Sequence, residues 1–303
     1  MPPKVSVGLP VRNGERFIGR AIDSVLAQDY PDLELVICDN VSEDRTVEIV
    51  RDYASRDPRV KLFENERDIG QIANMNRVFE LSTGEYFRWT GDDDWFERDY
   101  ISKCVAFLDE HPDFIAVSTY IKYSDDDGHE FYAEYTGERM ESPKPERRFA
   151  RMLWLLQADY RYADTHYAMY RSSALKQTGL LPVAFATDQL LAAELSLLGR
   201  FGHVPECLSY RRRVPAYYDK KETLHALYNP DQPEELRPSA VRQCVNFHRQ
   251  VERAQLSLGQ KAVCGAAIAR FLCVAESRLA VRRLRSAARR LPGYQHFKAA
   301  LGR

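Results

Sequence analysis

The sequence has no pair of cysteines spaced as C-x-x-C, although it contains six cysteines in 303 residues. Several of them fall inside apolar runs, as Cys38 does directly after Val36 and Ile37. Buried, reduced thiols fit this placement better than a disulfide framework or a zinc site. We therefore expect a protein of a reducing compartment, without structural zinc.

Long apolar runs and targeting patterns are also missing. The best candidate for a membrane span, residues 262–274, is shorter than a bilayer requires and is interrupted by Arg270. A strand-like pattern begins almost at the first residue, which leaves no room for a signal peptide. We expect a cytoplasmic protein.

The chain lacks a strong excess of one charge, since its formal net charge is −1. Residues 278–303 nevertheless contain Arg and Lys but no Asp or Glu, so a basic tail follows an acidic body. The tail could lie as an amphipathic helix on anionic lipid at the inner face of the membrane, dock on the acidic body, or be a solvated helix end. We expect no nucleic-acid partner, because no fold that recognises nucleic acid accompanies these basic residues.

Apolar runs of strand length alternate with helical repeats through the first 120 residues, in a composition with 45% hydrophobic and 29% charged residues. The expected strands are 5–9, 33–38, 60–63, 84–89 and 114–120, and the expected helices are 14–28, 42–56, 69–81 and 96–111. This alternation predicts an α/β fold, with a mostly parallel sheet flanked by helices on both faces.

The pattern loosens after Tyr120. The segment 125–128, three Asp and a Gly, predicts a solvated hairpin turn, and 141–148 predicts a surface loop. The expected later elements are helices at 149–157 and 187–198, a Pro-containing segment at 217–238, and helix from 241 to 290 with a break near Gly259.

Three adjacent carboxylates, Asp92, Asp93 and Asp94, directly follow the fourth expected strand. Ligands bind beyond the carboxyl ends of the strands in such sheets. A hard divalent ion would offset the repulsion between the carboxylates and keep positions open for phosphate oxygens. A polar turn or a helix N-terminus is the alternative, and the position after the fourth strand favours a metal site.

Asp39 closes the second expected strand. A carboxylate at that place can accept a hydrogen bond from a ribose hydroxyl or from the N–H of a base. The alternative is that Asp39 or Ser42 caps the following helix.

Taken in order and spacing, these segments resemble glycosyltransferase family 2, whose members are inverting enzymes with the GT-A fold. The resemblance covers about the first two hundred residues. Its motifs are the opening strand and P-x-x-N turn at 5–13, the D-x-S-x-D-x-T segment at 39–46, Asp68-Ile69-Gly70 followed by Asn76, and Gly84-Glu85-Tyr86-Phe87 leading to the three Asp residues.

The resemblance implies roles for individual residues. Those that would bind the nucleotide donor are Pro10, Arg12, Asp39, Arg67, Asp92 and Asp94. Asp93 would bind the metal that bridges the diphosphate, with Asp94 as the alternative ligand. Asp188 stands where the family carries its catalytic base.

Two further groups of residues are candidates for binding. Many relatives carry a His near position 213, where this chain has Arg211, Arg212 and Arg213. These arginines would contact the leaving diphosphate directly. Trp95 and His166 are candidates for contact with the acceptor sugar, with ordinary packing as the alternative.

The resemblance implies a GT-A domain at residues 1–213, with a nucleotide-sugar-binding half at 1–120 and an acceptor half at 121–213. A helical C-terminal region with the basic tail would follow at 214–303. The expected reaction is metal-dependent (Mn²⁺ or Mg²⁺), inverting hexosyl transfer from a UDP- or dTDP-sugar to a glycan, a lipid-linked acceptor or a small molecule.

Two alternatives compete with this function. A nucleotidyltransferase would need a Gly-rich phosphate loop after the first strand, and that turn has only Gly14. A catalytically inactive nucleotide-sugar-binding module would not need to retain Asp39, the three adjacent carboxylates and Asp188.

Overall fold

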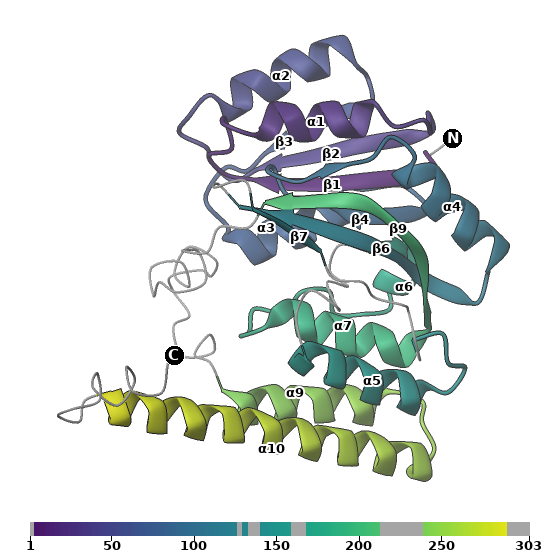
Figure 1. Ribbon diagram of the computed structural model, residues 1–303. Helices are drawn as coiled ribbons and strands as arrows, with labels where there is room; N and C mark the ends of the chain where they lie inside the picture. Colours follow the sequence, from purple (N-terminus) through teal and green to yellow (C-terminus); the bar gives the residue numbers. More distant parts are fainter. Residues whose placement is uncertain (1–2, 126–128, 133–139, 159–167, 213–238, 290–303) are drawn as a thin grey trace.

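A computed structural model describes residues 3–125, 129–132, 140–158, 168–212 and 239–289 (Figure 1). The strands in these residues form one sheet of nine in the order β3-β2-β1-β4-β8-β6-β9-β5, with β7 paired to β6. The predicted α/β fold is therefore confirmed.

The first half of the sheet is parallel. It contains β1 (Val5–Val11), β2 (Leu33–Asp39), β3 (Val60–Glu64) and β4 (Tyr86–Trp89). β1 pairs in parallel with both β2 and β4, and β2 pairs in parallel with β3. All seven residues of β2 are buried, as expected of a strand covered on both faces. The carboxyl ends of the four strands therefore meet at one edge of the sheet.

The second half of the sheet is mixed. Its strands are β5 (Trp95–Phe96), β6 (Phe114–Ser124), β7 (Glu130–Tyr132), β8 (Met169–Arg171) and β9 (Arg200–Arg212). β9 runs parallel to β6 and antiparallel to β5, while β8 is antiparallel to β4 and β6. The antiparallel pairing of β6 with β7 confirms the predicted hairpin, although the tip of its turn, residues 126–128, lies outside the described residues.

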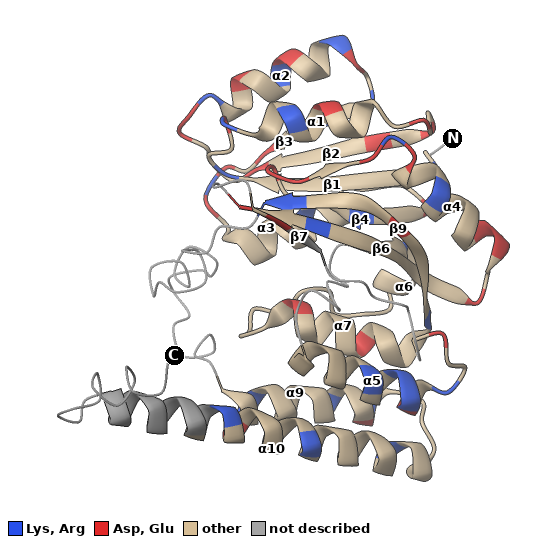
Figure 2. Cartoon of the chain, viewed as in Figure 1, with Lys and Arg blue, Asp and Glu red and all other residues tan. Residues whose placement is uncertain are grey.

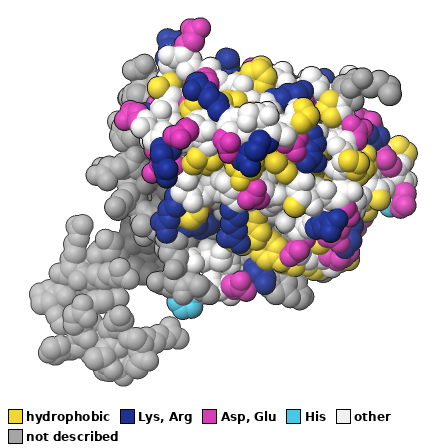
Figure 3. Space-filling view, turned by 90° about the horizontal axis from the view of Figure 1, so that it is seen from above, with side chains coloured by type: hydrophobic (Ala, Val, Ile, Leu, Met, Phe, Trp, Pro, Cys, Tyr) yellow, Lys and Arg dark blue, Asp and Glu magenta, His cyan; other side chains and the backbone are white. Residues whose placement is uncertain are grey.

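Helices cover both faces of the sheet (Figure 1). The helices α1 (Ile18–Leu26), α2 (Thr46–Arg56) and α4 (Tyr100–Glu110) share one hydrophobic core with the sheet. The helices α3 (Gln71–Glu80), α6 (Ser172–Leu175) and α7 (Thr187–Leu198) share a second core with the other face. Seen from the side of α2, the surface carries basic and acidic side chains intermixed (Figure 3).

A third core joins α5 (Pro145–Ala158), α7, α9 (Ala240–Arg253) and α10 (Leu258–Arg289). The prediction of a surface loop at 141–148 is wrong from Pro145 onward. Arg148 is buried, and its guanidinium donates to the carbonyl oxygens of Ser196, Leu197 and Ser142. These hydrogen bonds offset the cost of burying its charge. The break between the last two helices falls at residues 254–257, just before the predicted Gly259.

One stretch of α10, Leu258–Arg278, is long and apolar enough to cross a membrane by its length and composition. The stretch has 21 residues, and an 18-residue window within it has a mean hydropathy of 1.4 and is only 17% buried. This stretch extends beyond the expected run at 262–274 and, as expected, is interrupted by Arg270. A mostly exposed apolar helix remains to be explained.

Candidate functional site

The carboxyl edge of the parallel strands brings the predicted donor-binding residues together. Val11 at the end of β1 pairs with Asp39 at the end of β2, and Pro10 pairs with Cys38. Gly8 of β1 pairs with Trp89, the last residue of β4, so the loop that carries Asp92 begins beside the same edge. The Oδ2 atom of Asp92 would lie only 2.6 Å from a Cβ placed on Gly14. A larger residue at position 14 would displace this carboxylate or the side chain of Val11, so the small size of Gly14 lets the β1–α1 loop approach Asp92.

The two carboxylate oxygens of Asp39 differ in their hydrogen bonding within the described residues. Its side chain is 3% exposed, and its Oδ2 accepts a hydrogen bond of 2.9 Å from the backbone N–H of Ser42. Its Oδ1 is buried without a hydrogen-bond partner in the described residues. A buried acceptor without a partner costs free energy. A donor group of a ligand would remove that cost.

The loop after β2 is held against the loop after β1. The backbone N–H of Asn13 donates to Oγ of Ser42 at 2.8 Å, and Oδ1 of Asn13 accepts from the N–H of Glu43 at 2.8 Å. Val41 has a φ of 62°, which a β-branched residue rarely adopts. Strained conformations of this kind persist only where the surrounding contacts hold them in place, as these hydrogen bonds do.

Asn40 and Asp68 are important residues of this edge that the sequence did not single out for binding. The Asn40 side chain donates to Oδ1 of Asp68 at 2.6 Å and accepts from the N–H of Ile69 at 3.0 Å. Arg12 forms an ion pair with the same carboxylate. Asp68 therefore holds Arg12, a residue predicted to bind the nucleotide donor. The exposed Arg67 directly precedes Asp68 on the same loop. The one available signal was the position of both residues just after strand ends.

The three adjacent carboxylates face two arginines from β9. Nε of Arg211 lies 3.5 Å from Oδ1 of Asp94, and Nη1 of Arg212 lies 3.6 Å from Oδ2 of Asp93. Asp94 is 2% exposed, and its Oδ2 also accepts from the N–H of Gly91 at 3.1 Å. The positive charges that balance the negative charge of the acidic loop in this structure are therefore arginine side chains of the protein.

Two of these carboxylates are hard to ionise. Burial raises the pKa of Asp92 to about 7, and the neighbouring charge of Asp93 adds to the effect. Burial and then the charge of Asp94 raise the pKa of Asp93 to about 6, against the opposing effect of Arg211 and Arg212. Additional positive charge beside this loop would favour the ionised carboxylates.

The fit of these residues to a divalent metal is partial. Within the described part of the chain, no group of three or more His, Cys, Asp and Glu side chains is placed to hold a metal ion. Asp93 is the better ligand of the pair, because its side chain is 29% exposed whereas that of Asp94 is 2% exposed. A metal ion at this site would need further oxygen ligands from the substrate.

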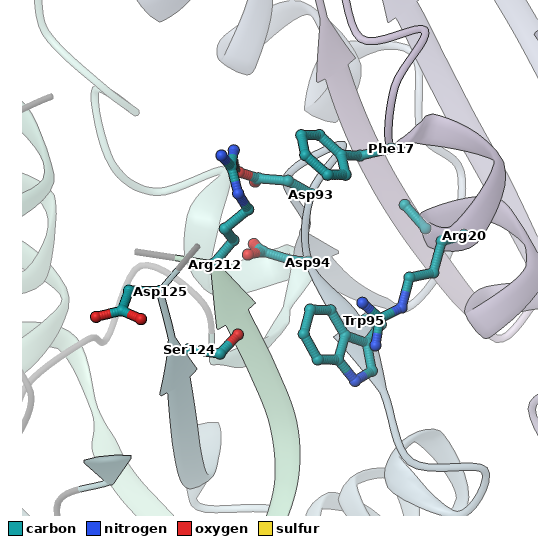
Figure 4. A pocket seen from close by; sticks show the side chains of 9 residues that line it. Phe17, Arg20, Asp93, Asp94, Trp95, Ser124, Asp125 and Arg212 are labelled. Carbon is teal, nitrogen blue, oxygen red and sulfur yellow. Dashed lines mark ion pairs between the residues drawn. The ribbon is translucent and has the colours of Figure 1, made fainter. Parts of the chain in front are cut away.

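A pocket of about 230 Å³ opens beside the acidic loop (Figure 4). It is lined by Phe17, Arg20, Ala21, Asp93, Asp94, Trp95, Ser124, Asp125 and Arg212. The guanidinium of Arg212 lies 4.5 Å from the ring centroid of Phe17. Phe17 and Arg20 were not predicted as site residues, because in the sequence they belong to the amphipathic repeat of the first helix.

Trp95 has neighbours on both faces of its indole ring. The guanidinium of Arg20 lies 3.4 Å from the ring centroid on one side. The ring of Tyr210 stacks on the indole at 5.3 Å with an interplanar angle of 5°. Trp95 thus lines the pocket without offering an open face for a sugar.

Asp188 is the second residue of α7, and its side chain is exposed. Ala186, just before the helix, has a φ of 57° and turns the chain into α7. The first turn of α7 lies on the side of the molecule toward which the parallel strands run (Figures 1 and 2). The role of Asp188 as a base stays a prediction, and the predicted residues His166 and Arg213 lie outside the described residues.

Residues 6–179 match the family model described as glycosyl transferase family 2. The chain is 39% identical over 119 residues to the putative glycosyltransferase EpsE of Bacillus subtilis, and the match covers 39% of this chain and 42% of EpsE. It is 30% identical over 135 residues to the glycosyltransferase GlyA of Streptococcus pneumoniae, and this match covers 45% of the chain and 19% of GlyA. The chain thus spans less than half the length of these curated relatives.

Solved structures with a similar fold include TarS of S. aureus in complex with UDP-GlcNAc, with a TM-score of 0.65 and 22% identity over 90% of this chain and 73% of TarS. Another is the mannosyltransferase PcManGT of Pyrobaculum calidifontis in complex with GDP-Man and Mn²⁺. It has a TM-score of 0.54 and 19% identity over 99% of this chain and 84% of PcManGT. At these identities the likeness establishes the GT-A fold alone.

Proposed function

Because this chain belongs to glycosyl transferase family 2, we propose that it transfers a sugar from a nucleoside-diphosphate donor to a hydroxyl group of an acceptor. The observation that carries this proposal is the buried Oδ1 of Asp39, which lacks a hydrogen-bond partner among the described residues and lies at the same sheet edge as the three adjacent carboxylates. The sugar nucleotides bound to the similar structures, UDP-GlcNAc and GDP-Man, support it. We assign the reaction to residues 1–213, with the donor bound by residues 1–120.

The base of the donor binds at Asp39 in this proposal. An imide N–H, which uracil and thymine both carry, is a donor that matches the unpartnered Oδ1. Pro10 and Arg12 border the same edge on the neighbouring strand and loop, and the exposed Arg67 directly precedes Asp68, which pairs with Arg12. A UDP- or dTDP-sugar is therefore the donor that we propose.

The diphosphate of the donor lies at Asp92, Asp93 and the two arginines of β9 in this proposal. A divalent cation bound by Asp93 would supply positive charge for the leaving diphosphate. Arg211 and Arg212 are already placed beside the carboxylates and can turn from them to phosphate oxygens. The chain's own cations would then share the stabilisation of the leaving group.

Inversion at the anomeric carbon needs a base on the face opposite the diphosphate. In our proposal the carboxylate of Asp188 takes the proton of the acceptor hydroxyl as its oxygen bonds to the anomeric carbon. The bond from that carbon to the diphosphate breaks in the same step, and the diphosphate leaves with the electron pair. The acceptor is a glycan, a lipid-linked molecule or a small alcohol.

We also propose a cytoplasmic location. All six cysteines are free in the structure, and four of them are buried: Cys38, Cys104, Cys244 and Cys264. A reducing compartment would keep them in this state.

A matched pair of substitutions in β2 tests the donor site. Asp39→Asn keeps the shape of the side chain but weakens its acceptor, so we expect at least about a tenfold loss of UDP or dTDP affinity. Glu34 is also a buried carboxylate, but its oxygens accept hydrogen bonds from Ser6 and Thr83 and form an ion pair with Lys61. Glu34→Gln should therefore lower stability by about 1–3 kcal/mol and leave nucleotide affinity unchanged. Titration calorimetry and urea unfolding measure the two effects, and equal affinities in the two variants would refute the assignment.

The same calorimetry tests the metal. Manganese should tighten UDP binding by wild-type protein, and Asp93→Ala should remove that increase without abolishing metal-free binding. Transfer at the wild-type rate in excess chelator would show that the arginines act without a metal.

A further inference from the structure

The helix α10 is the outermost element on the side of the molecule remote from α2 (Figure 1). Its inner face is buried through Cys264, Ala267, Ile268 and Phe271. Gln157 of α5 donates to the carbonyl oxygen of Phe271, and Lys261 pairs with Glu252 of α9. Among the described residues, α10 is thus anchored to α5 and α9 along one side.

The opposite face of α10 is exposed and nearly without charge. The exposed residues between 258 and 275 are Leu258, Gly259, Ala262, Val263, Gly265, Ala266, Ala269, Arg270 and Cys273. Arg270 is the one charged residue among them. Leu258 is 88% exposed and Val263 is 46% exposed. Exposed faces of soluble helices are normally polar, so this face indicates an environment other than water.

The neighbouring helices also carry large exposed apolar side chains. Val241 and Val245 of α9 are 56% and 43% exposed, and helical spacing puts them in one row with Glu252, which contacts α10. Trp154 of α5 is 40% exposed and lies three residues before Gln157, which also contacts α10. Tryptophan side chains favour the boundary between hydrocarbon and water.

Glu252 in this row pairs with Lys261, and the other charges beside the surface are mainly positive. Arg151 of α5 lies with its guanidinium 4.2 Å from the ring centroid of Trp154. Arg270 and Arg278 are exposed on α10, whereas Glu276 is the exposed acidic residue between them. The sequence from 278 to 303 adds further Arg and Lys residues but no Asp or Glu. An apolar surface bordered by basic residues is complementary to an anionic bilayer, because its apolar side chains can enter the lipid while its basic residues attract the headgroups.

We propose that the exposed face of α10, with Trp154, Val241 and Val245 beside it, lies on an anionic lipid bilayer with the helix axis in the membrane plane. A transmembrane orientation is disfavoured, because α10 is packed against α5 and α9, which carry exposed charges such as Arg147 and Arg249. The small side chains insert only shallowly. Attraction between the arginines and the lipid must therefore supply much of the affinity.

Vesicle binding by the full chain tests this surface. We expect it to co-sediment at low salt with phosphatidylcholine vesicles that contain about a third phosphatidylglycerol, and to dissociate as the salt concentration rises. The double variant Ala262→Glu, Ala269→Glu keeps good helix formers on the exposed face but opposes lipid contact. It should bind these vesicles at least about tenfold more weakly.

Ala106→Glu is the matched control, because Ala106 is an exposed alanine on α4, on the other face of the sheet. It should bind vesicles like the wild type, and unchanged nucleotide affinity in both variants would show that they fold. Vesicle binding does not depend on the proposed sugar transfer, so either can fail alone. Undiminished binding by the double variant, or no binding by the wild type at low salt, would overturn the proposal. A wild-type dimer in solution that the double variant breaks would assign the face to a second copy instead.

Discussion

At the scale of the residue, two carboxylates at opposite ends of β2 differ in how fully they are bonded. Glu34, near the amino end, accepts from Oγ of Ser6 at 2.5 Å and from the N–H of Thr83 at 2.7 Å, and it pairs with Lys61. Asp39, at the carboxyl end, has a buried oxygen without a hydrogen-bond partner in the part of the chain that the structure describes. A fully bonded buried carboxylate stabilises the fold, whereas a partly bonded one indicates a place for a ligand.

Asp188 provides the sharpest test of chemistry at this scale. Asp188→Asn keeps the side-chain shape at the start of α7 but cannot take up the acceptor proton. We expect the transfer rate to fall by roughly a hundredfold or more, the usual effect of losing a general base. Donor affinity and melting temperature should stay near the wild-type values. Donor titration and initial rates on one purified sample measure both, and a near-normal rate would leave Asp188 as a helix-terminus residue.

The residues that the sequence identified at the site are those that follow strand ends. Asp39 and the three adjacent carboxylates were found because a strand pattern runs directly into them. Asn40 and Arg20 were missed, because their importance comes from side-chain contacts with Asp68 and Trp95. Such contacts join segments distant in the sequence, and no local periodicity records them.

At the scale of the element, the pair β6–β9 holds a half-buried histidine. Burial lowers the pKa of His203 to about 4, and its Nδ1 lies 2.9 Å from Oγ of Ser118. In the unfolded chain the imidazole titrates near pH 6.5. Between about pH 6.5 and pH 4 the unfolded chain therefore binds a proton that the folded protein excludes, and stability falls as the pH falls.

Substitution of His203 should remove that dependence. We expect the wild type to lose on the order of 2 kcal/mol through this residue between pH 7 and pH 4.5. His203→Gln, which can still bond Ser118, should lose correspondingly less over the same range. Urea unfolding at both pH values measures the difference, and parallel losses in the two proteins would contradict the assignment.

The elements of the parallel half were predictable, and several of the mixed half were not. β1 to β4 are apolar runs between amphipathic helices, a pattern that local periodicity detects. β9 (Arg200–Arg212) is rich in polar and basic residues, and only part of it is buried, so it lacks a strand pattern. β5 has only two residues and exists through its pairing with β9.

At the scale of the whole molecule, the C-terminal helices support the helix that carries Asp188. Phe247 of α9 and Phe271 of α10 meet edge to face with centroids 5.3 Å apart, in the core that contains Leu190 of α7. The sequence predicted these helices but could not show where they pack. Their packing makes α10 part of the support of α7.

A core substitution tests this support. Phe271→Ala should lower the free energy of unfolding by about 3–5 kcal/mol. Because α7 would lose part of its support, the transfer rate should fall by at least about threefold while UDP affinity is kept. Leu108→Ala, in the core beneath α1 and α4, should lower stability without this selective loss of rate. Urea unfolding, calorimetry and initial rates check the pair, and equal rates in both variants would separate α10 from catalysis.

The stacking of Trp95 between Arg20 and Tyr210 has a practical consequence. The chain has only three tryptophans, and the other two are the buried Trp89 and the exposed Trp154. Their fluorescence therefore samples the interior, the pocket and the outer helical surface separately. With Trp89 and Trp154 replaced by phenylalanine, the emission of Trp95 becomes an intrinsic optical probe of events at the acidic loop, without an attached dye.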